Sequence, residues 1–253
     1  MLLVEPPPSQ GDLHFRVFGI PVRVHPYFWL VTLIFALQGN STPPAKVLIW
    51  IVAVFVSILI HELGHALFQM RYGGHPRIIL YGMGGLAACE DCDRSTRSQI
   101  LISLAGPGAG FLLAMVVLFL LQISGHEPGI AIGSGSQVSP PWISILGAKF
   151  HWFGFRSLPI NLLVGNLLWI NILWGAVNLL PIYPLDGGHI SRELCVLSQP
   201  RQGIVLSLQI SVACGILMAI VGLFWRSFFV TLLFGYLAYS SFRTLRAYRS
   251  YRD

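Results

Sequence analysis

Long apolar stretches, separated by short segments rich in glycine, proline and charged residues, run through most of this chain. Six of them stand out, at residues 27–38, 46–70, 100–123, 159–180, 203–224 and 227–242. A helix needs about 20 mostly apolar residues to cross a bilayer, and the last four stretches approach that length. The first is short unless its helix begins near Val22. The pattern predicts an all-α polytopic membrane protein with about six transmembrane helices.

Two segments outside these stretches have the pattern of extended chain. Residues 11–26 alternate apolar and polar positions around Arg16 and Arg23, which predicts a short strand or an interfacial segment. Residues 77–87, between the second and third predicted helices, are apolar and rich in glycine. Irregular backbone at membrane depth needs protein or a watery cavity to satisfy its hydrogen bonds. We expect either a small re-entrant β element, whose free edge pairs with a substrate backbone, or an ordinary interfacial loop.

Residues 124–158 are rich in Gly, Ser and Pro and then become aromatic around Trp152. This composition predicts a flexible connector that leads into an aromatic anchor at the membrane surface. The segment is too short for a separate globular domain. We therefore expect one membrane-embedded domain over residues 1–253, with a core of about residues 15–225 and a last span with a basic cytoplasmic tail at 226–253.

Composition supports the membrane assignment. The 253 residues are 55% hydrophobic and 10% charged, with a mean hydropathy of +0.70, whereas soluble domains carry about 25% charged residues. The N-terminal ten residues contain Glu5 and a proline run, so we expect no cleaved export segment. Four cysteines do not resemble a disulfide framework. Cys89 and Cys92 form a CxxC that is either half a zinc site, a redox pair or, as we expect, an inert cytoplasmic thiol pair.

We interpret the net charge of +6 as a signal of membrane topology rather than of nucleic-acid binding. With six spans, twelve basic residues lie on the side of the termini: Arg16, Arg23, Arg71, Arg77, Arg94, Arg97, Arg192, Arg201, Arg243, Arg246, Arg249 and Arg252. Only Lys46, Lys149, Arg156 and Arg226 lie on the other side. Because cytoplasmic loops carry the excess of Lys and Arg, both termini are predicted to be cytoplasmic.

The second apolar stretch runs directly into His61-Glu62-Leu63-Gly64-His65. Positions i and i+4 share one face of a helix, so His61 and His65 can hold one metal ion. Glu62 can then take a proton from water at that ion. Ionisable groups inside a membrane helix are rare and usually functional. A structural polar pair without a metal is the alternative.

A third ligand is available where the fourth stretch must break. Residues 178–189 read NLLPIYPLDGGH, in which Pro181 and Pro184 remove helix donors, so that Asp186 projects from a broken helix end. The second and fourth spans both run inward, which places Asp186 at the depth of the two histidines. Asn171 and Asn178 share a helix face and either hydrate a cavity or hydrogen-bond between helices. His189 is either an outer partner of a ligand or a loop histidine.

HELGH and NLLPIYPLDGGH in this order, together with FGIPVRVHPYFWL at residues 18–30 and SLAGP at 103–107, resemble the site-2 protease family of intramembrane zinc metalloproteases. The resemblance covers roughly residues 15–225. One departure is Gly110, where the family often has Asn; Gly106 and Gly110 form a small-xxx-small pair suited to close helix packing. The length suggests a minimal form without the PDZ insert or CBS pair of some relatives.

The resemblance implies one zinc ion per chain, held by His61, His65 and Asp186, with Glu62 activating water. It also implies that the glycine-rich loop and the turn after the fourth span present an unwound substrate helix. The implied substrate-binding residues are Gly82, Met83, Gly84, Gly85, Asn178 and Pro181.

These features favour a protease that cuts in or near a transmembrane segment of another protein, as in regulated intramembrane proteolysis. Its partners would be a membrane-spanning protein substrate and the lipid bilayer of a bacterial or archaeal cell membrane, and no nucleic acid. Three alternatives remain: a transporter or channel with a buried polar path, a catalytically inactive scaffold of the same fold, and a membrane-anchored peptidase with a glutamate as third ligand. For the last, Glu90, Glu127 and Glu193 do not sit on plausible helix faces.

The topology can be tested with reporter fusions. Fusions after Arg94 and at the C-terminus should report the cytoplasm, and one near Ser134 should report the outside, because the basic residues are distributed twelve to four. A cytoplasmic signal from the Ser134 fusion would contradict the six-span arrangement.

Overall fold

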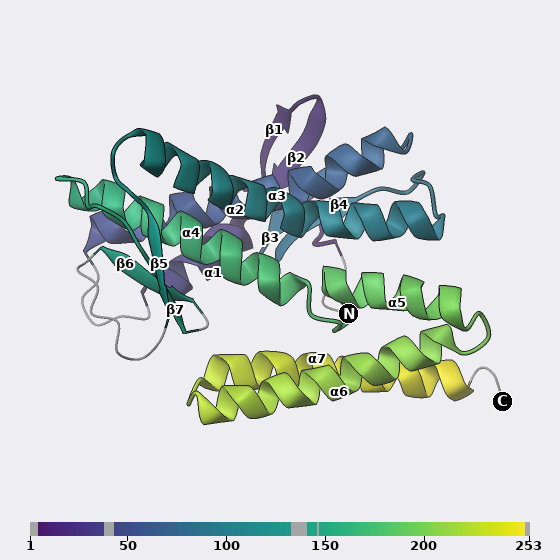
Figure 1. Ribbon diagram of the computed structural model, residues 1–253. Helices are drawn as coiled ribbons and strands as arrows, with labels where there is room; N and C mark the ends of the chain where they lie inside the picture. The colour runs from purple at the N-terminus through teal and green to yellow at the C-terminus, as the bar shows by residue number, and fades with distance from the viewer. Residues whose placement is uncertain (1–4, 38–42, 133–140, 146, 251–253) are drawn as a thin grey trace. The chain divides into compact units, whose positions relative to one another are not determined.

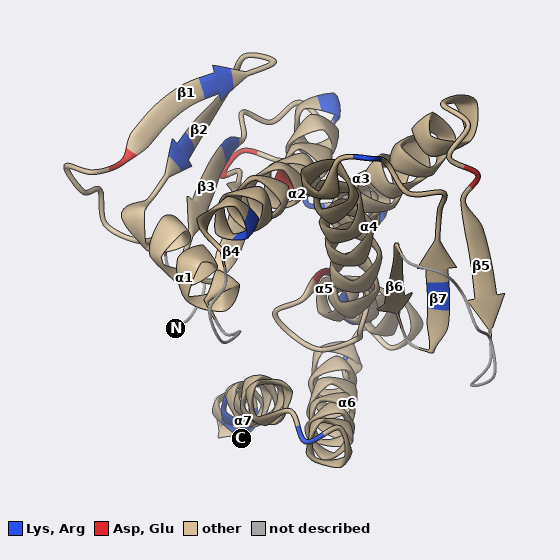
Figure 2. Ribbon diagram, turned by 90° about the vertical axis from the view of Figure 1, so that its left-hand side faces the viewer, with Lys and Arg blue, Asp and Glu red and all other residues tan. Residues whose placement is uncertain are grey.

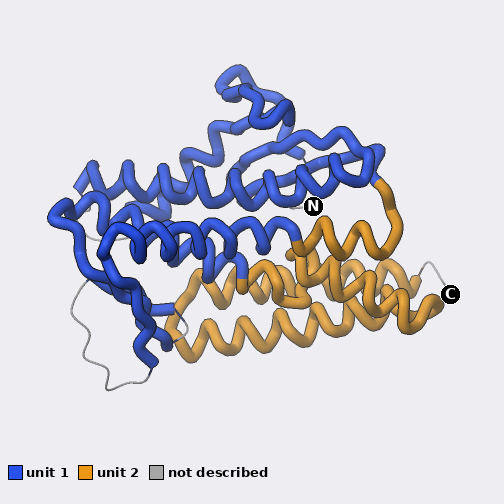
Figure 3. The backbone as a smooth tube through the Cα atoms, turned by 45° about the horizontal axis from the view of Figure 1, so that its top comes forward, with its two compact units in different colours: residues 1–92, 105–175 blue, residues 93–104, 176–253 orange. Residues whose placement is uncertain are grey.

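The computed structural model describes residues 5–37, 43–132, 141–145 and 147–250 (Figure 1). The chain forms two compact units, residues 1–92 with 105–175 and residues 93–104 with 176–253 (Figure 3).

Seven helices follow one another along the described chain. They are α1 (Pro26–Ala36), α2 (Pro44–Arg71), α3 (Thr96–Ile123), α4 (Leu158–Asn178), α5 (Asp186–Ser198), α6 (Gly203–Phe224) and α7 (Phe228–Ser250). Five of them, all but α1 and α5, are long and apolar enough to cross a membrane. Figure 2 shows how few charged residues these helices carry. The mainly helical fold, with several helices of membrane-spanning length, is therefore confirmed.

The predicted count of six spans is not confirmed, because the first apolar stretch forms only the 11-residue helix α1. At about 1.5 Å per residue this helix is far shorter than the hydrocarbon core of a bilayer. Its expected last residue, Gln38, lies outside the described residues. The Pro26 that follows the preceding strand sets the start of α1, with the His25 side chain accepting from the Tyr27 main-chain N–H at 3.2 Å.

A four-stranded sheet in the first unit contains β1 (Leu13–Val17), β2 (Ile20–Val24), β3 (Arg77–Tyr81) and β4 (Gly84–Ala88), in that order. The β1–β2 and β3–β4 pairs are antiparallel, and β2 pairs with β3 in parallel. The alternating residues 11–26 thus contain the β1–β2 hairpin. The glycine-rich residues 77–87 lie in a second hairpin, made of β3 and β4, and β4 is at the edge of the sheet. Strands between α2 and α3 agree with the predicted β element, and its re-entrant position stays a prediction.

The sheet packs on the helix that carries the HELGH motif (Figure 2). Alternate residues of β2 and β3 point into one apolar cluster, with Val24, Ile78 and Leu80 fully buried. Their partners from the helices are Phe28, Ile58, Leu63 and Ala66. This apolar cluster holds the sheet against α2.

The segment before α4 contains a second sheet, so much of the predicted flexible connector is regular structure, while its Gly- and Ser-rich residues 133–140 lie outside the described residues. Strands β5 (Gly129–Ile132), β6 (Trp142–Ile145) and β7 (Ala148–His151) pair in the order β5-β7-β6. Trp152 is 4% exposed and packs in an apolar cluster with Leu121 and Leu168. Its Nε1 donates to Asn161 Oδ1 at 3.1 Å. This tryptophan is therefore part of a core, and the aromatic anchor at the membrane surface stays a prediction.

In the second unit, α6 and α7 pack side by side along their length (Figure 1). Gly215 lies against Ala238 and Gly222 against Thr231, so that a Cβ at either glycine would press on the backbone of α7. Ser211 and Ser241 hydrogen-bond across the helices at 2.8 Å. Small residues thus set the close spacing of this helix pair.

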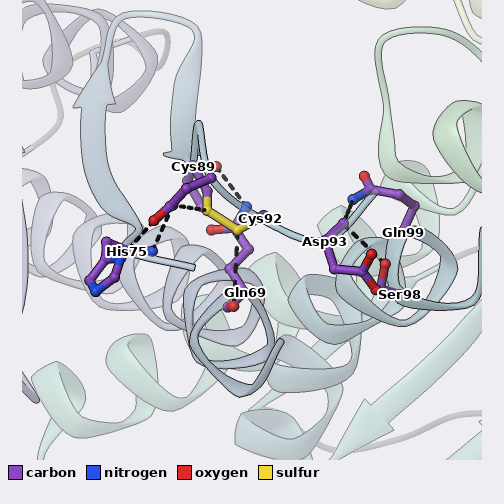
Figure 4. Close-up of a disulfide and its surroundings, with 9 residues drawn as sticks. Gln69, His75, Cys89, Cys92, Asp93, Ser98 and Gln99 are labelled. Atoms are coloured by element: carbon purple, nitrogen blue, oxygen red, sulfur yellow. Dashed lines mark hydrogen bonds and ion pairs between the residues drawn. A yellow bond between two sulfur atoms is a disulfide. The ribbon is translucent and has the colours of Figure 1, made fainter. Parts of the chain in front are cut away.

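Cys89 and Cys92 form a disulfide directly after β4 (Figure 4), so the expectation of an inert thiol pair is wrong. Asp91, between them, accepts from the His75 main-chain N–H at 2.9 Å and pairs with the His75 ring at 2.6 Å. These hydrogen bonds with His75 hold the pKa of the Asp91 carboxyl below its ordinary value.

Candidate active site

The polar residues of the HELGH motif are buried near the C-terminal end of α2. His61, Glu62 and His65 are 5%, 6% and 8% exposed. The Nε2 atoms of the two histidines lie 3.1 Å apart, close to the about 3.3 Å that separates two ligands of a tetrahedral zinc with bonds of about 2.0–2.1 Å. The predicted sharing of a helix face is therefore confirmed, and the two imidazoles fit one metal ion.

A glycine of α3 lies against both imidazoles. A Cβ added at Gly106 would overlap His65 Nε2 and come within 2.8 Å of His61 Nε2. On the facing side, a Cβ at Gly64 would overlap the carbonyl oxygen of Ala105. The two helices approach so closely here that only glycine leaves the ring nitrogens room for an ion. The sequence indicated close packing at Gly106, but not that its partners are the two histidines.

Glu62 faces the edge strand β4. A Cβ added at Gly85 would overlap the Glu62 side chain, including Oε1, so the backbone of β4 lies directly on this carboxylate. Gly84 has a φ of +124°, a conformation that L side chains rarely adopt. Gly82 and Met83 form the turn between β3 and β4, and Met83 is 48% exposed. The predicted glycine-rich loop and the predicted base thus lie together in the first unit.

Asn171 joins α4 to α2. Its Nδ2 donates to Ser57 Oγ and to the Leu167 carbonyl oxygen, both at 2.8 Å. Asn171 is 3% exposed, and a Cβ at Gly110 would lie 3.4 Å from its Oδ1. The helix–helix hydrogen bond, one of the two readings of this residue, is therefore present, and Gly110 packs next to it.

The remaining predicted residues lie in the second unit. Asn178 ends α4 and is 7% exposed, and Pro181 lies in the irregular segment that follows. Asp186 is the first residue of α5, whose N-cap is Leu185. The predicted break is therefore present, but Asp186 begins a new helix that the sequence analysis missed. His189 lies on this helix rather than in a loop, with its ring 5.2 Å from that of Tyr183.

Two glycines allow the break and the new helix to lie against each other. A Cβ at Gly187 would overlap the carbonyl of Leu179, and one at Gly188 would come within 2.6 Å of the Tyr183 main-chain nitrogen. The chain between α4 and α5 thus folds back on the first turn of α5. This contact fixes the backbone around Asp186.

The motifs, helices and sheet can be compared with known proteins. A family model described as Peptidase family M50 matches residues 49–220, more than half of the chain. The chain belongs to peptidase family M50. The resemblance to site-2 proteases is thereby confirmed, and this M50 chain has the sequence features of a membrane zinc metalloprotease family.

Several relatives are similar to this M50 chain. Zinc metalloprotease MJ0392 of Methanocaldococcus jannaschii is 28% identical over 184 residues, 71% of this chain and 44% of that protein. The putative zinc metalloprotease sll0528 of Synechocystis sp. is 26% identical over 81% of this chain and 50% of that protein. Stage IV sporulation protein FB of Bacillus subtilis is 26% identical over 68% and 46%. The chain spans about half the length of these curated relatives.

The fold was compared with solved structures as well. The structure of the site-2 protease from Methanocaldococcus jannaschii matches with a TM-score of 0.55 and 24% identity, over 92% of this chain and 94% of that chain. At this identity the likeness concerns the fold alone.

The contact between Gly106 and the histidines can be tested by metal content. Gly106→Ala should weaken zinc binding at least about tenfold, the lower end of what disturbing a ligand's surroundings causes, because the new methyl group overlaps the ring nitrogens. Gly108→Ala, on the same helix with nothing within 4 Å of the added Cβ, should bind zinc normally. Zinc per chain in the purified proteins measures both. Full zinc in Gly106→Ala would contradict the packing described here.

Proposed function

We propose that this chain is an intramembrane zinc metalloprotease that hydrolyses a peptide bond in or near a transmembrane segment of another membrane protein. The observation that carries the proposal is the buried group of two imidazoles with Nε2 atoms 3.1 Å apart, next to a buried glutamate. Apolar side chains would serve the structure of an apolar helix better than these polar groups do, so the polar groups indicate a function. A membrane protease needs it for chemistry.

In the proposed site, His61, His65 and Asp186 hold one zinc ion. Two imidazoles with a carboxylate and an open position are typical of catalytic zinc. When bound, zinc would lower the pKa of water to about 7 and polarise the substrate carbonyl. The position of Asp186 at the start of α5, fixed by the contacts of Gly187 and Gly188, supports its role as third ligand.

Glu62 is the proposed general base. Its carboxylate accepts a proton from the attacking water and then donates that proton to the nitrogen of the leaving amine. Burial of Glu62, at 6% exposure, and its contact with the Gly85 backbone hold the carboxylate in one place. A fixed base avoids much of the reorganisation that a mobile one would need.

Strand β4 is the proposed docking edge for the substrate. A transmembrane helix must unwind before its backbone can be cut, and an extended segment can then pair with a free strand edge. Because Gly85 already contacts Glu62, a segment paired with β4 would run past the base. Gly82, Met83 and Gly84 form the near end of this edge, and Asn178 and Pro181 are proposed to support the unwound segment from the turn after α4.

Two substitutions separate the proposed roles of base and ligand. Glu62→Gln keeps the size of the side chain but cannot accept a proton, so zinc should stay at about one per chain while cleavage falls about 10²–10⁴-fold. Asp186→Ala removes a ligand, so zinc and cleavage should fall together. Zinc analysis and cleavage of a co-reconstituted single-span membrane protein measure both quantities. Full zinc and activity in Asp186→Ala would exclude this residue as a ligand.

The contact between β4 and the proposed base can be tested at Gly85. Gly85→Ala should reduce cleavage by about 10²-fold, the effect of displacing a catalytic group by about 1 Å, because its Cβ pushes Glu62 aside. Bound zinc should not change, since no proposed ligand lies on β4. Cleavage and zinc content are measured against Gly108→Ala. Loss of zinc in step with activity would instead make β4 part of the scaffold of the metal site.

A further inference from the structure

The loop that follows β4 contains a second group of metal-binding side chains. The donor atoms of Cys89, Asp91 and Cys92 lie within 4.8 Å of one another. None of these residues belongs to the HELGH motif or to the proposed zinc site. Figure 4 shows the two sulfur atoms and the surrounding side chains.

The protein backbone holds this loop in place. A Cβ at Gly74 would overlap both sulfur atoms, so the two cysteines pack directly on the chain that leaves α2. Cys92 Sγ lies 3.9 Å from the carbonyl oxygen of Gln69, and Gln69 Nε2 donates to the Ala87 carbonyl at 3.0 Å. The end of β4 and the CxxC loop are thus both fixed to the last turn of α2.

The carboxylate between the cysteines is also oriented. Asp91 Oδ1 accepts from the His75 main-chain N–H at 2.9 Å, and Oδ2 lies 2.6 Å from the His75 ring nitrogen Nδ1. The Cys89 sulfur lies 3.4 Å from Oδ1. The carboxylate therefore faces the sulfur atoms, and His75 fixes it as outer partners commonly fix the ligands of a metal.

The geometry points to a second zinc site, in which the dithiol form of the loop binds one Zn²⁺ through Cys89, Cys92 and Asp91. Two thiolates favour zinc over the hard cations magnesium and calcium, and tetrahedral zinc accepts a carboxylate as a further ligand. Water completes the four positions. The site is separate from the proposed catalytic one, because its ligands include sulfur and it shares no residue with the catalytic site.

The disulfide and the metal exclude each other, because sulfur atoms bonded to one another are not thiolates. A dithiol reductant opens the bond: the reductant is oxidised to its own disulfide, and Cys89 and Cys92 each gain one electron and one proton. Zn²⁺ then displaces both thiol protons to solvent as the two Zn–S bonds form. Oxidation of the loop would release the ion.

Cobalt substitution tests the site through a signal that the histidine site cannot give. The full chain is purified in detergent, reduced with a phosphine and titrated with Co²⁺ alone. Thiolate ligation should give a sulfur-to-cobalt charge-transfer band in the near ultraviolet, and one Co²⁺ per chain should saturate it when the histidine site has been removed. The band should remain in His61→Ala/His65→Ala, and it should be absent from protein that was never reduced.

Three variants assign the ligands. Cys89→Ser/Cys92→Ser should lose the band, while Cys195→Ser/Cys214→Ser, which removes the two free cysteines, should keep it. Asp91→Asn retains both thiols and should weaken Co²⁺ binding by at least about 10–100-fold, the range measured even for outer partners. The proposal is overturned by reduced wild-type protein without the band, by a band that persists in Cys89→Ser/Cys92→Ser, or by unchanged affinity in Asp91→Asn.

Discussion

The approach of Gly106 to the two imidazoles of α2 is the contact on which the site depends. Two polar rings on an apolar helix need a neighbour that excludes lipid from them and leaves the space in front of their nitrogen atoms empty. A glycine backbone does this, because it brings α3 close and adds no side chain. The contact of Gly64 with Ala105 on the other helix brings the two backbones together at the same level. Small residues on two helices thus create room for an ion in a region where interiors are normally filled.

The sheet adds the second constraint. Buried side chains of β2 and β3 pack on α2, while β4, at the edge, places Gly85 on the Glu62 carboxylate. One face of α2 is therefore held by apolar packing, and backbone from β4 and α3 lies against the polar groups near its end. Rigid apolar contacts on one side allow a reactive arrangement on the other, since the helix cannot turn to relieve the burial of its charged residue.

Local patterns predicted the features that depend on one segment. The i, i+4 spacing of His61 and His65 determines their common face, and alternation at residues 11–26 predicted extended chain, although not that it would form a hairpin. Features that depend on distant segments were missed. The partner of Gly106 is set by tertiary packing, and α5 was hidden because Pro184 and two glycines surround its first residue. Short strands β5–β7 were concealed by the glycine and serine around them, and the closure of Cys89 on Cys92 depends on how the loop folds over Gly74.

The parallel pairing of β2 with β3 has a consequence for the order of assembly. Val22 pairs with Ile78 and Val24 with Leu80, and the whole of α1 and α2 lies between these strands. During synthesis the β2 edge of the N-terminal hairpin therefore stays unpaired until the ribosome has made α2 and β3. Long-range strand pairing of this kind is slow, because the intervening loop must first be ordered. The strand that lies on Glu62 thus joins the sheet only when the helix carrying that glutamate has been completed.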